Sequence, residues 1–515
     1  MSFCNDYKYK KVTHDEGEIE DAEPVSARRK LSQLAKIAIP TAFLMLLVLS
    51  AWRGYVLSLI LQTAIDICRA WLSSSLDCDT PQDGFACSAN VSHFWGQYSP
   101  FHRVPSKVSD KIPHHCNVTF VQMLSRHGAR DPTAFKSLAY HDLITTLKKS
   151  VESFHGKYAF LASYEYTLGA DQLTVFGQQQ MVNSGIKFYK RYRELGRENI
   201  PFVRASGQKR VVDSATNWTR GFHETFLRDK CHGRDKFPYE IVVMSEEDGT
   251  NNTLNHHLCT AFESGPVSQI GRNAQLQWIG IFVPPIQKRL NSDLPGANFS
   301  KVDVINFMDL CPFETVASSK ASLSPFCNLF SEEEWHQFDY YQSLGKYYGF
   351  GPGNPLGPTQ GVGWVNELIA RLTHAPLNDS TSTNHTLDDN PTTFPIDIKH
   401  KLFADFSHDN DMTSIMGALG LYNLTNPLPV TFIESPDDVD GYSAAWTVPF
   451  AARVYIEKLQ CAGEEDELVR VLVNDRVIPM SVCGGESSGF CKLGDFISSL
   501  AFARNGGHWD QCFVS

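Results

Sequence analysis

The hydrophobic and polar positions of the chain fall into blocks, and three blocks repeat one order: an apolar run, a polar turn and a helical segment. The apolar runs cover residues 118–125, 198–206 and 401–407, and they end at RHGAR, GQKR and HDND. Each run has the length and composition of a buried strand, and each following segment has helical spacing. Strands that alternate with helices predict an α/β fold with a mainly parallel central sheet flanked by helices.

Ligands of such sheets bind beyond the carboxyl ends of the strands, so we expect the three polar turns to meet at one site.

Thr174 is expected to cap a helix that runs through Gln180 into Tyr192. Residues 469–482 are expected to form two strands that fold back about the pair Asn474-Asp475.

The apolar spacing of residues 209–345 is mostly helical, which predicts a smaller α-rich domain at one wall of the cleft. The α/β domain would then comprise residues 78–208 and 346–515. Residues 378–393 are rich in Asn, Asp, Ser and Thr and contain two glycosylation sequons, which predicts an exposed, glycosylated loop.

The N-terminal residues differ from the rest. Residues 1–36 are polar and acid-rich and are predicted to form a disordered cytosolic tail. Residues 37–72 are apolar and then amphipathic, and Arg28, Arg29 and Lys30 precede them, as expected for a type II single-pass membrane anchor with the bulk of the chain outside. A cleaved signal peptide, which would give a secreted protein, and a buried helix are the alternatives.

Two features indicate a domain exported through the secretory pathway. Eleven of the 13 cysteines lie at or beyond Cys78, and an exported protein pairs most of its cysteines. All eight sequons follow the apolar segment, which suggests N-glycans. The plasma membrane, the vacuole and secretory compartments remain open. The sequon asparagines are Asn90, Asn117, Asn217, Asn251, Asn298, Asn378, Asn384 and Asn423.

The formal charge of the chain bears on two classes of partner, nucleic acids and anionic ligands. The chain carries −11, and residues 1–76 hold nine Lys/Arg and eight Asp/Glu, so −12 remains on the rest. No basic stripe is present, so nucleic acid is not an expected partner. An anionic ligand would need a local positive pocket, and its binding should improve at acid pH, where carboxylates become protonated.

If the three turns meet, they bring together residues suited to phosphoryl transfer: Arg126, His127, Arg130, Arg210, His408 and Asp409. Arginine forks match phosphate oxygens. Neighbouring cations lower the pKa of a histidine, which keeps His127 neutral and nucleophilic. Asp409 would be the general acid and then the base.

Other interpretations of these residues remain open at this point. His127 is compatible with a surface histidine, Arg210 with a pair to Asp213, and Asp409 or Asp411 with a helix N-cap. No metal-ligand spacing such as His-Glu-x-x-His occurs, so neither a metal nor a cofactor is expected.

At RHGARDPT, followed much later by SHDN, the chain resembles the histidine acid phosphatases. Longer segments resemble the fungal 3-phytases of that family, among them GKYAFLASYEYTLGADQLTVFG, GNPLGPTQGVGWVNELIARLTH and YSAAWTVPFAARVYIE, and the similarity covers residues 78–515. The resemblance implies a large α/β domain beside a smaller α domain and no metal. It also implies His127 as the phosphate acceptor, Asp409 as the proton donor, and Arg126, Arg130, Arg210 and His408 as the phosphate-binding set.

The same resemblance implies a disulfide pattern and leaves Cys231 without a partner. The implied pairs are Cys78–Cys87, Cys116–Cys461, Cys259–Cys512, Cys311–Cys327 and Cys483–Cys491.

The chain departs from the phytases at the expected specificity rim. Asp131 stands where an aromatic residue is usual, Lys136 is the one lysine left of a lysine-rich run, and Gly345 precedes Lys346 where a second lysine is common. Fewer cations and an added carboxylate weaken a pocket for a polyanion.

We therefore expect a monomeric phosphate monoesterase that acts on phytate (myo-inositol hexakisphosphate) through a phosphohistidine. One alternative is an acid phosphatase of broad specificity. The second is a non-catalytic surface protein that binds inositol phosphates.

Overall fold

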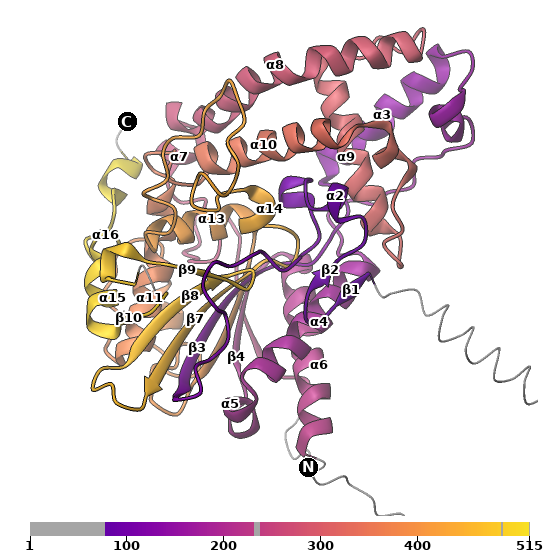
Figure 1. Cartoon of the computed structure of the whole chain (residues 1–515). Helices are drawn as coiled ribbons and strands as arrows, with labels where there is room; N and C mark the ends of the chain where they lie inside the picture. Colours follow the sequence, from indigo (N-terminus) through magenta and orange to yellow (C-terminus); the bar gives the residue numbers. More distant parts are fainter. Residues whose placement is uncertain (1–77, 231–236, 486–487, 514–515) are drawn as a thin grey trace, which may run out of the picture. The chain divides into compact units, whose positions relative to one another are not determined.

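The computed structural model describes residues 78–513 except 231–236 and 486–487 (Figure 1). Residues Cys78–Ser515 form one compact unit. The predicted tail (1–36) and anchor (37–72), as well as Cys231, lie outside the described residues. Across the described part of the chain, every helix is too short or too polar to span a bilayer.

The core of this unit is a mixed eight-stranded sheet in the order β10-β8-β7-β3-β6-β4-β5, with β9 paired to β8. One half is parallel, as the strand-turn-helix blocks predict, and consists of β3 (Cys116–Arg126), β6 (Leu402–Ser407), β4 (Phe202–Ser206) and β5 (Ile241–Met244). The other half is antiparallel and consists of β7 (Arg453–Cys461), β8 (Leu468–Val473), β9 (Arg476–Ile478) and β10 (Cys491–Lys492).

Helices cover both faces of the sheet because side chains alternate along the central strands. Leu402, Ala404 and Phe406 of β6 pack towards α4 (Val175–Arg191) and α6 (Lys209–Lys230). Phe403 and Asp405 face the other way, where Trp364 of α11 (Val362–Thr373) donates to Asp405. Figure 1 shows α4 and α6 on one side of the strands and α11 on the other.

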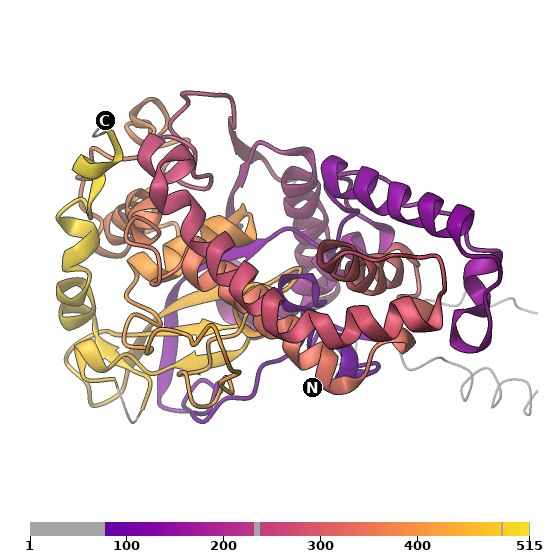
Figure 2. The same ribbon diagram turned by 90° about the horizontal axis from the view of Figure 1, so that it is seen from above.

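A group of long helices lies beyond the carboxyl ends of the parallel strands and is seen from above in Figure 2. It contains α3 (Ala134–Ser150), α8 (Ile270–Asp293), α9 (Lys301–Ala317) and α10 (Glu332–Gly349). The predicted α-rich range, 209–345, includes α8, α9 and most of α10. It also includes α6 and β5, which belong to the sheet layers, whereas α3 comes from outside the range and packs on α9. The subdivision into two domains therefore stays a prediction.

The remaining elements are short and connect these layers. They are β1 (Asp79–Thr80), β2 (Gly84–Phe85), α2 (Ala89–Ser92), α5 (Arg193–Glu198), α7 (Thr260–Ser264), α12 (His385–Asp388), α13 (Asp409–Ala418), α14 (Ala444–Thr447), α15 (Leu493–Ser499) and α16 (Ala501–Arg504).

Local sequence signals explain several of these boundaries. Thr174 caps α4 as predicted, because its side chain accepts from Gly177 N. Asn474 and Asp475 have φ of 48° and 69° and form the predicted two-residue turn between β8 and β9. Five disulfides are present, and they join the five pairs named above.

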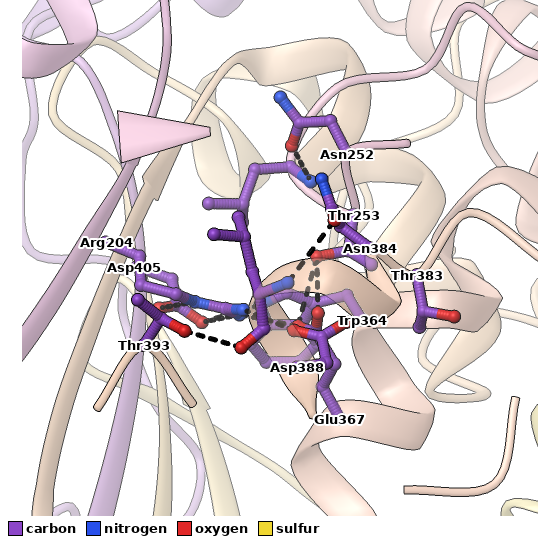
Figure 3. Close-up of polar contacts among 12 residues, drawn as sticks. Arg204, Asn252, Thr253, Trp364, Glu367, Thr383, Asn384, Asp388, Thr393 and Asp405 are labelled. Atoms are coloured by element: carbon purple, nitrogen blue, oxygen red, sulfur yellow. Dashed lines mark hydrogen bonds and ion pairs between the residues drawn. The ribbon is translucent and has the colours of Figure 1, made fainter. Parts of the chain in front are cut away.

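The loop 378–393 is only in part the exposed segment that its composition predicts. Asn378 and residues 389–392 are exposed, but Thr381, Thr383 and Asp388 are buried. The Asp379 carboxylate accepts from the hydroxyls of Thr381 and Thr383, so the polar side chains satisfy one another inside the loop. Figure 3 shows Asp388 beside Arg204 and Glu367.

Candidate active site

The polar turns after β3 and β6 meet at one edge of the sheet. Arg126, the last residue of β3, is paired with Ser407, the last residue of β6. The next residue, His127, donates its backbone N–H to Ser407 O over 3.1 Å. The rings of His127 and His408 have centroids 5.6 Å apart. The expected convergence of these two turns is therefore present.

The turn after β4 reaches the same place through α6. Arg210 lies in the first turn of α6, one turn before Ser214. The Ser214 hydroxyl accepts from Gly128 N over 3.1 Å, which ties α6 to the residue after His127. Gly128 also packs against the backbone of α4: a Cβ at this position would lie 2.4 Å from Gly177 O. Only glycine permits this close approach.

His127 is held as a neutral ring with one free nitrogen. It is 1% exposed, and its Nδ1 lies 2.8 Å from Gly128 O. A carbonyl only accepts, so Nδ1 carries the proton and Nε2 keeps its lone pair. Burial lowers the pKa of His127 well below its ordinary value, and Arg126, Arg210 and Arg130 lower it further. The ring is thus a nucleophile at acid pH.

The three arginines of the site are short of acceptors. Among the described residues, Nε and Nη2 of Arg126, Nε of Arg130 and Nε of Arg210 are buried without a hydrogen-bond partner. Burial and the neighbouring Arg130 lower the pKa of Arg126 and of Arg210 to about 10, although nearby carboxylates act in the opposite direction. Buried, unfilled guanidinium N–H groups favour an anion with several oxygens.

Asp409 begins α13 and lies between two cations. Its Oδ2 is 2.5 Å from Lys346 Nζ, and its Oδ1 is 3.4 Å from Arg126 Nη2. Burial alone would raise the pKa of Asp409, but Arg126 and Lys346 hold it well below its ordinary value. In the free site Asp409 is therefore a carboxylate. Lys346, expected at the rim, directly contacts this residue.

Two other positions of the expected rim, Lys136 and Gly345, line a cavity of about 290 Å³. Lys136 reaches into it from α3 and is 3.0 Å from the Asp309 carboxylate. Gln275 occupies the space that a side chain at position 345 would need. A Cβ on Gly345 would lie 2.4 Å from Gln275 Nε2. Asp131 is half-buried, and burial raises its pKa.

The alternative partners suggested by the sequence are not those observed. Arg210 Nη1 lies 3.3 Å from Asp171 Oδ1, while Asp213 pairs with Lys209 instead. The N-cap of α13 is His408, and its side chain makes no capping bond.

Sequence analysis missed two acidic residues of the site, Asp171 and Glu246. Glu246 Oε1 lies 3.0 Å from His408 Nε2. Glu246 follows β5, so the strand-end argument would have found it, had the half-exposed run IVVM been identified as a strand. Asp171 lies in a loop and has φ of 61°, and no local motif marks it.

The chain is similar to known phosphatases over most of its length. The family model "Histidine phosphatase superfamily (branch 2)" matches residues 117–474. Phytase A of Emericella nidulans is 54% identical over 442 residues, which cover 85% of this chain and 94% of the relative. Phytase A of Aspergillus fumigatus is 50% identical over 445 residues, which cover 86% and 95%.

Solved structures give the same picture. The phytase from D. castellii is 25% identical, with a TM-score of 0.67, and the match covers 86% of this chain and 92% of that one. A multiple inositol polyphosphate phosphatase of Bifidobacterium longum, solved with inositol hexasulfate, has a TM-score of 0.52 at 17% identity and covers 80% and 98%. This second likeness bears on the fold alone.

Proposed function

The chain belongs to branch 2 of the histidine phosphatase superfamily, and from this premise we propose that it hydrolyses phosphate monoesters, phytate among them, through a phosphohistidine at His127. One observation carries the proposal: a neutral imidazole with a free Nε2 lies among three arginines whose buried N–H groups lack acceptors. A phosphoryl group supplies those acceptors and is the electrophile that such a ring attacks.

In the first step Arg126, Arg130, Arg210 and His408 bind the phosphoryl oxygens. Nε2 of His127 attacks phosphorus, the phosphorus–oxygen bond to the alcohol breaks, and the leaving oxygen takes a proton from Asp409. In the second step water attacks the phosphohistidine and gives its proton to Asp409. Phosphate and the free His127 are then regenerated.

Asp409 needs a proton before it can act as the acid, and the substrate provides the reason for it to gain one. A bound phosphoryl group brings negative charge next to the carboxylate and competes for Arg126 and Lys346. Both effects raise the pKa of Asp409 in the complex above its low value in the free site. Acid pH then completes the protonation.

Two observations favour phytate over a simple ester as the substrate. The relatives of this chain are phytases, and cations lie beyond the phosphate-binding set. Lys136 and Lys346 lie beside the 290 Å³ cavity, where further phosphates of an inositol ring would bind. Each of these lysines already has a carboxylate partner, Asp309 or Asp409. This pairing supports the rival, an acid phosphatase of broad specificity, as the second candidate.

Kinetics on two substrates test the proposal. We expect kcat/KM for phytate to exceed that for an aryl phosphate at acid pH, and the reverse order would favour the broad phosphatase. His127→Ala should lower kcat on both by about 10⁴-fold or more. If His127→Ala retained wild-type rates, the phosphohistidine mechanism would be excluded.

A second variant separates an enzyme from a binding protein. Asp409→Asn should lower kcat by roughly 10²–10⁴-fold, because the leaving oxygen then departs without a proton. A non-catalytic inositol-phosphate-binding protein would show no turnover before or after this change.

We also propose that the domain is exported as a glycosylated monomer and tethered by residues 37–72. The five disulfides and five exposed sequon asparagines (Asn90, Asn117, Asn298, Asn378 and Asn423) support export. Glycosidase treatment should reduce the mass of the protein expressed in a eukaryotic host. The full chain should partition into detergent, whereas a cleaved signal peptide would leave the mature protein in the aqueous phase.

A further inference from the structure

Glu246 is a carboxylate of the site that contacts neither an arginine nor a lysine, unlike Asp409 and Asp171, and pairs with His408 instead. It follows β5 and is only 11% exposed at its side chain. A carboxylate repels a phosphate group, so it does not contribute to substrate binding by direct contact. Its presence beside His408 therefore calls for another role.

One oxygen of Glu246 joins the ends of three strands. Oε1 accepts from His408 Nε2 over 3.0 Å, from Ser206 Oγ over 2.5 Å and from Gln208 N over 3.2 Å. Ser206 ends β4, Gln208 precedes Arg210 by two residues, and His408 follows β6. The same atom thus fixes the His408 ring relative to the start of the helix that carries Arg210.

The donors also keep the carboxylate ionised. Burial would raise the pKa of Glu246, but the bonds from His408, Ser206 and Gln208 lower it to about 2. The acceptor for the His408 N–H is therefore retained throughout the acid range in which the enzyme is expected to work.

The segment behind Glu246 is anchored in the protein interior. Asn252 Nδ2 donates to Ser206 Oγ and to the carbonyls of Met244 and Ser245. The next residue, Thr253, donates to Glu367 over 3.0 Å, and Figure 3 shows Asn252 and Thr253 next to the buried ion pair of Arg204 and Asp405. The contacts of Asn252 and Thr253 thus connect Ser206 and the end of β5 to the buried charged residues of the interior.

On these contacts we propose that Glu246 is a positioning residue, whose carboxylate orients the His408 ring so that the ring can bind the transferring phosphoryl group. The proposal rests on the function proposed above. It predicts that Glu246 acts on phosphate binding only through His408.

The test is a double-mutant cycle read by inhibition with inorganic phosphate. Glu246→Gln keeps the size of the side chain and removes the charge. We expect Glu246→Gln to raise the Ki for phosphate and to lower kcat/KM for an aryl phosphate by about 10–100-fold, as for other residues that orient a ligand-binding histidine. In a His408→Ala background the same change should have little further effect, because the ring that it orients is gone.

Two results would overturn the proposal: an unchanged Ki in Glu246→Gln, or an equal loss with and without His408. Glu247→Gln, at the exposed neighbour, is the matched control and should leave both constants unchanged. If Glu246→Gln does not fold, Ser206→Ala removes one bond to the same oxygen and should raise the Ki about threefold in the wild-type background alone. A wild-type protein that neither turns over nor binds phosphate would instead refute the proposed function.

Discussion

Arg126 and Arg204 are both buried arginines on β3 and β4, the two strands that flank β6 in the sheet, yet their surroundings differ. Arg204, in β4, donates to both oxygens of Asp405 and to Glu367. Burial would lower the pKa of Arg204, but Asp405 and Glu367 raise it well above its ordinary value. Arg126, at the end of β3, donates to two backbone carbonyls, and its one counter-charge among the described residues is Asp409 at 3.4 Å.

The balance of charge separates a structural cluster from a binding site. In the interior cluster, Arg204 and Arg371 face the carboxyl groups of Asp405 and Glu367. The cluster also contains Asp388, whose pKa is raised to about 8 by burial and by Glu367. At the strand ends, four cations (Arg126, Arg130, Arg210 and Lys346) face three carboxylates (Asp409, Asp171 and Glu246). The excess of cations is what a phosphoryl group neutralises.

The largest expected effect follows from removing a strand-end cation. Arg126→Met should lower kcat/KM by on the order of 10³-fold, because the charge that stabilises the transferring phosphoryl group is lost. Phosphate should also no longer raise the melting temperature of the variant, as it does when a ligand binds the native state alone. Wild-type kcat/KM in Arg126→Met would show that this arginine is structural, like Arg204.

The corresponding change in the interior cluster should affect stability instead. Arg204→Met leaves Asp405 and Glu367 buried with one cation fewer, which costs about 3–5 kcal/mol of unfolding free energy. Denaturant unfolding measures this loss, and the Ki for phosphate of the folded variant should stay at the wild-type value. Arg220→Met, at an exposed surface pair, is the control and should cost less than about 1 kcal/mol.

The sequence predicts the fold class and the meeting of the polar turns, but it misses other parts of the structure. The turns after β3, β4 and β6 are marked by apolar runs that end in polar residues, so their meeting follows from the general geometry of parallel strands. Glu246 follows β5 and was missed because the half-exposed run IVVM was not identified as a strand. Asp171 could not be assigned in this way, because it lies in a loop whose position depends on tertiary packing.

Local composition was misleading where polar side chains satisfy one another. The loop 378–393 is polar and was expected at the surface, but Asp379 accepts from Thr381 and Thr383, and the loop carries Asp388 into the interior. A polar composition predicts exposure because burying polar groups away from water costs free energy. It does not reveal the hydrogen bonds inside the loop that offset this cost. Likewise, α3 packs on α9 across a long sequence separation that helical spacing does not reveal.

The smallest expected effect concerns Asp388 and depends on pH. Its pKa is about 8 in the folded state and near 4 in the unfolded chain, so below pH 4 the residue is protonated in both. As the pH rises from 4 to 8, only the unfolded chain loses the proton, and the contribution of Asp388 to stability falls. The side chain in Asp388→Asn cannot ionise in the folded or the unfolded protein. The variant should therefore not show this loss of stability between pH 4 and pH 8.

Compared with the wild type, Asp388→Asn should gain on the order of 2 kcal/mol of unfolding free energy between pH 5 and pH 7, measured by denaturant unfolding at each pH. Asp389→Asn is the matched control: its side chain is 77% exposed, and its curve should run parallel to that of the wild type. A parallel curve for Asp388→Asn as well would mean that Asp388 is ionised in the folded protein. The charges of the interior cluster would then not be balanced, and charge balance could not explain why this cluster is structural.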